Sequence, residues 1–185
     1  MKKKFNKAKS TLESLKTIAN KGKINLLYLD ETGFSGNLPV NYSWIKKGTE
    51  KCVEKVNDHS IKVNSLCMFN YALKDFYWST TQNTVDSDMF IGLFELAKPD
   101  FAVPTFIVLD NCSIHRSNKV KKKAKEWAKD NVFLYFIPPY SPELNIIEPK
   151  FKNLKYHHIH KRHFNNRDEL ESNIHKGIFK MCQNA

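Results

Sequence analysis

The 185-residue chain lacks the features that mark several classes of protein. Its apolar stretches without a charged side chain, such as residues 101–109 and 131–142, are far shorter than the roughly 18–20 apolar residues that span a membrane. The basic opening segment has neither the apolar core nor the small-residue cleavage site of a secretory signal. We therefore expect a cytoplasmic protein with no membrane partner.

Cysteine is also sparse, and its spacing excludes two kinds of site. Cys52, Cys67, Cys112 and Cys182 stand far apart and form no CxxC pair, which argues against a zinc knuckle and a disulfide scaffold. No internal repeat or low-complexity tract is visible. Hydrophobic residues make up 41% and aromatic residues 12% of the chain, the composition of one ordinary globular domain.

Basic residues, in contrast, are abundant and unevenly placed. The formal net charge of the chain is +11. Three segments together have a larger positive net charge than the whole chain: residues 1–23, 116–129 and 149–185. The first holds eight basic residues and one acidic residue, the second seven and one, and the third eight and three, so the remainder is acidic. This distribution favours a surface that binds a polyanion beside a site rich in carboxylates.

The order of apolar runs predicts one α/β domain over residues 24–185, preceded by a basic helix or tail over residues 1–23. In that tail Leu12, Leu15 and Ile18 are too sparse to anchor much. The nearly continuous apolar run at residues 24–29 is typical of a strand that is covered on both faces. Further strands are expected at residues 42–46, 61–73, 76–80, 105–109 and 132–137, and helices at residues 86–97, 117–129, 147–160 and 167–181.

Three carboxylates give the first chemical signal. Asp30 and Asp110 each come directly after a buried strand, where open α/β sheets hold ligands, and Glu148 lies near the start of the 147–160 helix. Carboxylates that lie close together repel one another unless a cation neutralises them, and Mg²⁺ is a hard ion that prefers oxygen ligands. Taken singly, each residue could instead cap a turn or a helix.

Four motifs carry these carboxylates, and together they resemble the catalytic domain of the mariner-type superfamily of DDE transposases, in its bacterial insertion-sequence branch. On this resemblance the three family carboxylates fall on Asp30, Asp110 and Glu148, and 37 residues separate the last two. The motifs are LYLDE (27–31), YSWIKKG (42–48), VLDNCSIH (108–115) and PPYSPELNIIEPKFKNLK (138–155).

The resemblance implies an RNase H-like fold, in which helices flank a mixed five-stranded sheet. It also implies metal-dependent DNA cleavage and strand transfer at the ends of an insertion sequence, with two Mg²⁺ or Mn²⁺ ions held by the three carboxylates. We expect a homodimer on double-stranded DNA in the nucleoid. Two alternatives stay open: an inactive remnant that keeps nonspecific DNA binding, and an RNase H-like nuclease.

The chain departs from the family pattern at three places. Ile146 stands where the family has proline, and Phe151 stands where it has tryptophan, but both replacements are apolar. Full-length relatives also begin with helix-turn-helix modules, and residues 1–23 are too short to form one. We therefore expect such a portion to be fused upstream or supplied as a separate chain.

Several polar residues complete the predicted site. His115 and Asn111 follow Asp110 closely and are expected to be accessory residues, while Glu31 should point to the face of the strand opposite to Asp30. Zinc binding by the histidines at residues 157–163 is disfavoured, because no cysteine or carboxylate lies among them. DNA phosphates are expected to contact Lys119, Lys121, Lys122, Lys123, Lys125, Lys150, Lys152, Lys155 and Arg162.

Overall fold

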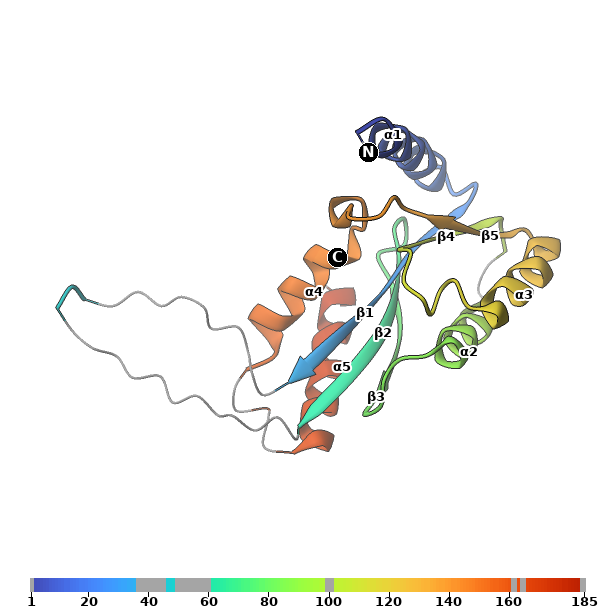
Figure 1. Cartoon of the computed structure of the whole chain (residues 1–185). Helices are drawn as coiled ribbons and strands as arrows, with labels where there is room; N and C mark the ends of the chain where they lie inside the picture. Colours follow the sequence, from blue (N-terminus) through green and yellow to red (C-terminus); the bar gives the residue numbers. More distant parts are fainter. Residues whose placement is uncertain are drawn as a thin grey trace.

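A five-stranded mixed sheet forms the centre of the protein, as Figure 1 shows for a computed structural model that describes residues 2–35, 46–48, 61–98, 102–160, 163 and 166–183. The strand order is β3-β2-β1-β4-β5. The first three strands along the chain pair antiparallel, whereas β4 and β5 continue the sheet parallel to β1. The strands are β1 (Asn25–Ser35), β2 (Lys62–Asn70), β3 (Phe76–Thr81), β4 (Thr105–Leu109) and β5 (Val132–Phe136).

Helices cover both faces of this sheet and give the molecule three layers. Figure 1 shows α2 and α3 together on one side of the sheet and α4 and α5 on the other. The predicted architecture, with helices flanking a mixed sheet of five strands, is therefore confirmed. The helices are α1 (Lys2–Ala19), α2 (Ser87–Ala97), α3 (Asn118–Trp127), α4 (Ile147–Asn153) and α5 (Arg167–Gln183).

Strand β1 is buried on both faces, as its apolar run predicts. Leu26 and Tyr28 join one core cluster with α1, α4 and α5, whereas Leu27 and Leu29 join the other cluster with α2 and α3. All four side chains are fully buried. Each buried leucine stabilises the fold by roughly 1.5–3 kcal/mol, so β1 holds the two layers together.

Side-chain caps fix where α2 and α3 begin. Asp86 accepts a hydrogen bond from the backbone N–H of Met89 at 2.9 Å, and Ser117 accepts one from that of Val120 at 3.3 Å. The Ser87 hydroxyl donates to Ser117 Oγ at 2.8 Å and joins the two helix starts. Capping of this kind is the reason why serine and aspartate mark helix starts in a sequence, and both predicted starts lie within one residue of the observed ones.

The expectation that the opening segment makes little contact with the core is wrong. Residues Ala8 and Leu12 of α1 are 4% and 2% exposed and belong to the same cluster as α4 and α5. The prediction counted only the large apolar residues, yet Ala8, Leu12, Leu15 and Ala19 recur at helical spacing and form one stripe. Ile18 lies off that stripe and is 38% exposed.

The expectation that β1 ends at Asp30 is also wrong, because the strand continues to Ser35. Pairing with the parallel strand β4 stops at Tyr28, but pairing with β2 runs on to the end of β1. Asp30 therefore lies where β1 is paired with β2 but no longer with β4. Of the strand predicted at residues 42–46, residues 42–45 lie outside the described residues, and Lys46 is not in a strand.

The predicted 147–160 helix is present, but it changes its winding. Helix α4 passes into a π-helical turn at Leu154–His158. There α5 approaches closely, since a Cβ on Gly177 would lie 2.6 Å from Leu154 Cδ1.

No helix within the described part of the chain is long and apolar enough to cross a membrane.

Candidate active site

The three predicted carboxylates line one pocket of about 360 Å³. Asp30 and Asp110 reach it from the neighbouring parallel strands β1 and β4, and Asp110 follows the last residue of β4 directly. Glu148 enters from the first turn of α4. Residues that are 80 and 38 positions apart in the sequence thus meet at one edge of the sheet, which is where this topology holds ligands.

Buried neighbours hold Glu148 at the pocket. Ile147 and Phe151 are 0% and 5% exposed and anchor α4 in the core, and Ile146 packs partly against the same cluster. The two family positions at which this sequence differs therefore keep their apolar packing. Pro149 lies in the first helical turn, where its missing N–H removes no helical hydrogen bond.

The environment of Asp30 disfavours a negative charge. Burial is the main cause that raises its pKa from 3.8 to about 7, with further contributions from Glu31, Glu148 and Asp110. A hydrogen bond from the backbone N–H of Glu31, 2.8 Å from Asp30 Oδ1, opposes the rise. A bound cation would remove the repulsion, so this cluster of oxygen ligands fits Mg²⁺ or Mn²⁺.

The side chain of Asp110 is held by His115, which is 1% exposed. His115 Nδ1 lies 3.0 Å from Asp110 Oδ1, which also accepts a hydrogen bond from the backbone N–H of Cys112 at 2.9 Å. Asp110 itself remains 47% exposed. These contacts fix the orientation of the carboxylate while leaving it open to the pocket.

A second group of polar side chains lies behind Asp110. His115 Nε2 is 3.4 Å from Glu31 Oε1, and Cys112 Sγ is 3.3 Å from His115 Nδ1. Burial alone would lower the pKa of His115, but the contacts with Cys112 and Glu31 outweigh burial and raise it. Glu31 and Cys112 thus hold His115, and Cys112, which also lines the carboxylate pocket, was not among the predicted site residues.

Two asparagines connect the loop after β5 to the carboxylates. Asn111 donates a hydrogen bond to the carbonyl of Ile137, which ties the end of β4 to the start of this loop. Asn145, 2% exposed, donates through Nδ2 to Asp30 Oδ2 at 3.3 Å and lies 3.4 Å from the carbonyl of Leu29. Asn145 was not predicted as a site residue, although it is the final residue of the PPYSPELN motif.

The lysines predicted on α3 divide into two groups. Lys119 forms an ion pair with Asp88 at 2.6 Å, and Lys123 forms one with Glu95 at 3.2 Å, so both connect α3 to α2. Lys121, Lys122 and Lys125 are exposed. The second group is therefore better placed to contact a polyanion than the first.

The lysines of α4 and its π-helical turn also differ. Lys150 Nζ lies 4.4 Å from the ring centre of Phe69, and Lys155 Nζ lies 5.5 Å from that of Phe34. Burial lowers the pKa of both amines. Lys152 is exposed, whereas Arg162 lies outside the described residues.

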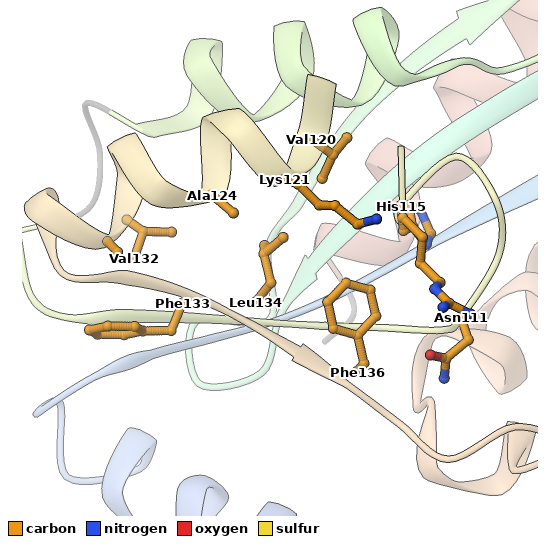
Figure 2. A pocket seen from close by; sticks show the side chains of 11 residues that line it. Asn111, His115, Val120, Lys121, Ala124, Val132, Phe133, Leu134 and Phe136 are labelled. Atoms are coloured by element: carbon orange, nitrogen blue, oxygen red, sulfur yellow. The ribbon is translucent and has the colours of Figure 1, made fainter. Parts of the chain in front are cut away.

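A second pocket, of about 510 Å³, lies between α3 and β5 and holds none of the three carboxylates (Figure 2). Its walls are mostly apolar, with Val120 and Ala124 on one side and Leu134 and Phe136 on the other. Figure 2 shows Lys121 extending from α3 toward His115. Lys121 and His115 both line this pocket.

Comparison with known families identifies the superfamily of the chain. The sequence profile of the "DDE superfamily endonuclease" family matches residues 25–171, which include all three carboxylates. The chain belongs to the DDE superfamily of endonucleases. No curated protein matches it.

Solved structures agree with this DDE assignment at the level of the fold. The Mos1 transposase paired-end complex with the left transposon end matches with a TM-score of 0.66 and 16% identity over 99% of this chain. The Mos1 mariner paired-end complex with Mn matches with a TM-score of 0.66 and 15% identity over 99% of this chain. A simian T-cell lymphotropic virus intasome in complex with a PP2A subunit matches with a TM-score of 0.58 and 10% identity over 84% of this chain. The predicted RNase H-like fold is confirmed.

The DDE chain is shorter than these relatives. It spans 60% of each Mos1 chain and 47% of the intasome chain.

Proposed function

We propose that this DDE domain catalyses metal-dependent DNA strand cleavage and strand transfer at the ends of an insertion sequence. The observation that supports the proposal most strongly is the shared pocket of Asp30, Asp110 and Glu148 in a chain of this family. Both reactions are in-line displacements at phosphorus. Water forms a new P–O bond as the bond to the 3′ oxygen breaks, and the freed 3′-OH then attacks a second phosphodiester in the same way.

The chain's own residues prepare the pocket for this chemistry. Asn145 and the backbone N–H of Glu31 orient Asp30, and His115 orients Asp110. Two Mg²⁺ or Mn²⁺ ions, held by the three carboxylates, would supply activation of the nucleophile and stabilisation of the leaving 3′ oxygen. Substitution of any one carboxylate would leave the ligand set incomplete.

Exposed basic residues on α3 and α4 support double-stranded DNA as the substrate. Lys121, Lys122 and Lys125 on α3 and Lys152 on α4 can neutralise phosphates without breaking ion pairs seen in the fold. Such contacts position DNA but carry no sequence information. Recognition of the element ends is therefore expected from a helix-turn-helix portion, fused or separately encoded. The domain is expected to act as a homodimer in the nucleoid.

A strand-transfer assay with a precleaved DNA end tests the proposal. Wild-type protein is expected to join the labelled end to a target duplex in Mg²⁺ or Mn²⁺, and EDTA is expected to stop the reaction. Asp110→Asn and Glu148→Gln should each lower the rate on the order of 10³-fold or more, since the metal site is worth several kcal/mol. Glu143→Gln, in the same loop but outside the pocket, is the matched control and should keep the wild-type rate.

The same assay separates the alternatives. Binding without any joining or cleavage in either metal would support an inactive remnant, and degradation of RNA in RNA–DNA hybrids would support an RNase H-like nuclease. Joining at the wild-type rate by Asp110→Asn would contradict the proposed role of that residue.

A further inference from the structure

Tyr140 has an environment that the folded domain alone does not explain. Its side chain is 95% exposed, the highest value among the exposed large hydrophobic side chains of the described residues. Its backbone φ is +56°, in the left-handed region that aromatic residues rarely adopt. The same residue lines the pocket of Asp30, Asp110 and Glu148.

The loop around Tyr140 is firmly held, so the exposure is built into the fold. On either side Ile137 and Ser141 are 3% and 6% exposed. The Ser141 hydroxyl donates to the carbonyl of Pro139 at 3.4 Å, and the Ser141 carbonyl accepts from the backbone N–H of Leu144 at 3.0 Å. With both flanks anchored, the backbone of Tyr140 is held at the pocket.

Such an arrangement is unfavourable for the free protein. A left-handed backbone at a residue with a Cβ is strained, and strain of this kind gathers at functional sites. Exposure of the ring also forgoes the burial that an aromatic side chain normally contributes. A ligand that covers the ring would recover part of this loss.

The chemistry of the pocket indicates which ligand covers the ring. If the carboxylates hold a DNA phosphate through metal ions, as proposed above, the nucleobase of that nucleotide or of its neighbour lies at the rim. Bases stack on aromatic side chains without regard to sequence. We propose that Tyr140 stacks on an unpaired nucleobase of the strand whose phosphate lies at Asp30, Asp110 and Glu148, an inference that rests on the proposed function.

Equilibrium binding to DNA with an unpaired precleaved end tests this role, with 2-aminopurine at the terminal position as the probe. The assay is run with Ca²⁺, which takes oxygen ligands as Mg²⁺ does, so that the carboxylates can hold the phosphate; because the end is already cleaved, the assay needs no cleavage. Wild-type protein and Tyr140→Phe should both quench the probe. Tyr140→Leu should lose the quenching and bind roughly 5- to 150-fold more weakly, the range measured for loss of one stacked base.

Two further variants separate stacking from folding. Tyr140→Gly relieves the positive φ, so its melting temperature should equal or exceed that of the wild type while its binding falls like that of Tyr140→Leu. Tyr156→Leu is the matched control, since Tyr156 is 60% exposed but does not line the pocket, and it should change neither quenching nor affinity.

The outcomes distinguish this inference from the proposed function. Equal quenching and affinity for wild type and Tyr140→Leu would overturn the stacking role, even if the wild type joins DNA. Loss of quenching in Tyr140→Leu would support the stacking role, even if no cleavage occurs with Mg²⁺ or Mn²⁺.

Discussion

Removal of the charge at Asp30 should stabilise the metal-free protein at neutral and higher pH. Its pKa rises from 3.8 to about 7 in the folded state, so the ionised carboxylate opposes folding by roughly 4 kcal/mol above pH 7, at about 1.4 kcal/mol per pH unit. The folded state binds this proton more tightly than the unfolded chain does. Stability of the wild type should therefore fall as the pH rises from about 4 to about 7, and then level off.

Asp30→Asn should recover only part of this energy. One carboxylate oxygen accepts from the backbone N–H of Glu31 and the other from Asn145 Nδ2, so the new amide must oppose one donor with its own NH₂ group. That mismatch costs about 1–2 kcal/mol. The expected net gain at pH 8 is about 2–3 kcal/mol, or roughly 5–10 °C in melting temperature for a chain of this size.

Urea unfolding of both proteins in EDTA, from pH 4 to pH 8, measures the effect. The advantage of Asp30→Asn should grow across this range, and added Mg²⁺ or Mn²⁺ should reduce it by stabilising only the wild type. Glu143→Gln, an exposed control, should stay within about 0.5 kcal/mol of the wild type. An Asn variant no more stable than the wild type at pH 8 would refute the view that burial opposes ionisation of Asp30.

Two further predictions concern other parts of the fold. Leu12→Ala should lower the free energy of unfolding by about 2–5 kcal/mol, because Leu12 is 2% exposed in the shared core; a decrease below about 1 kcal/mol in urea unfolding would mean that α1 does not pack in solution. For duplex DNA, the logarithm of the binding constant falls linearly with the logarithm of the salt concentration. Lys121→Gln and Lys122→Gln should each reduce the magnitude of this slope by about 0.9 for every phosphate that the variant no longer neutralises. The ion-paired Lys119, replaced in the same way, should change that slope less, and equal slopes for all variants would place the DNA elsewhere.

Much of the fold could be predicted because local signals and tertiary packing agree. The apolar run before Asp110 occupies β4 as expected, and capping residues mark the starts of α2 and α3. Glu148 lies in the first turn of α4 for a local reason, because the following Pro149 fits only in the first turn of a helix. These elements follow from hydrophobic period and backbone chemistry alone.

The remaining features depend on partners that are distant in the sequence. The continuation of β1 past Asp30 follows from pairing with β2, which no local pattern in the polar stretch after Leu29 indicates. Asn145 reaches Asp30 across 115 residues, and Glu31 lies against Cys112 and His115 across about 80. Lys119 and Lys123 resemble Lys121 in the sequence, and only the acidic residues of α2 distinguish them.

Two unfavourable features occur at the same pocket, and one set of ligands would relieve both. Burial and neighbouring carboxylates disfavour the charge on Asp30, while a positive φ and nearly full exposure are imposed on Tyr140. Asn145, which orients Asp30, belongs to the same PPYSPELN segment as Tyr140. Cations would neutralise the first and an unpaired base would cover the second. Because stability is then lowest in the free protein, metal and DNA should stabilise the domain together more than either does alone.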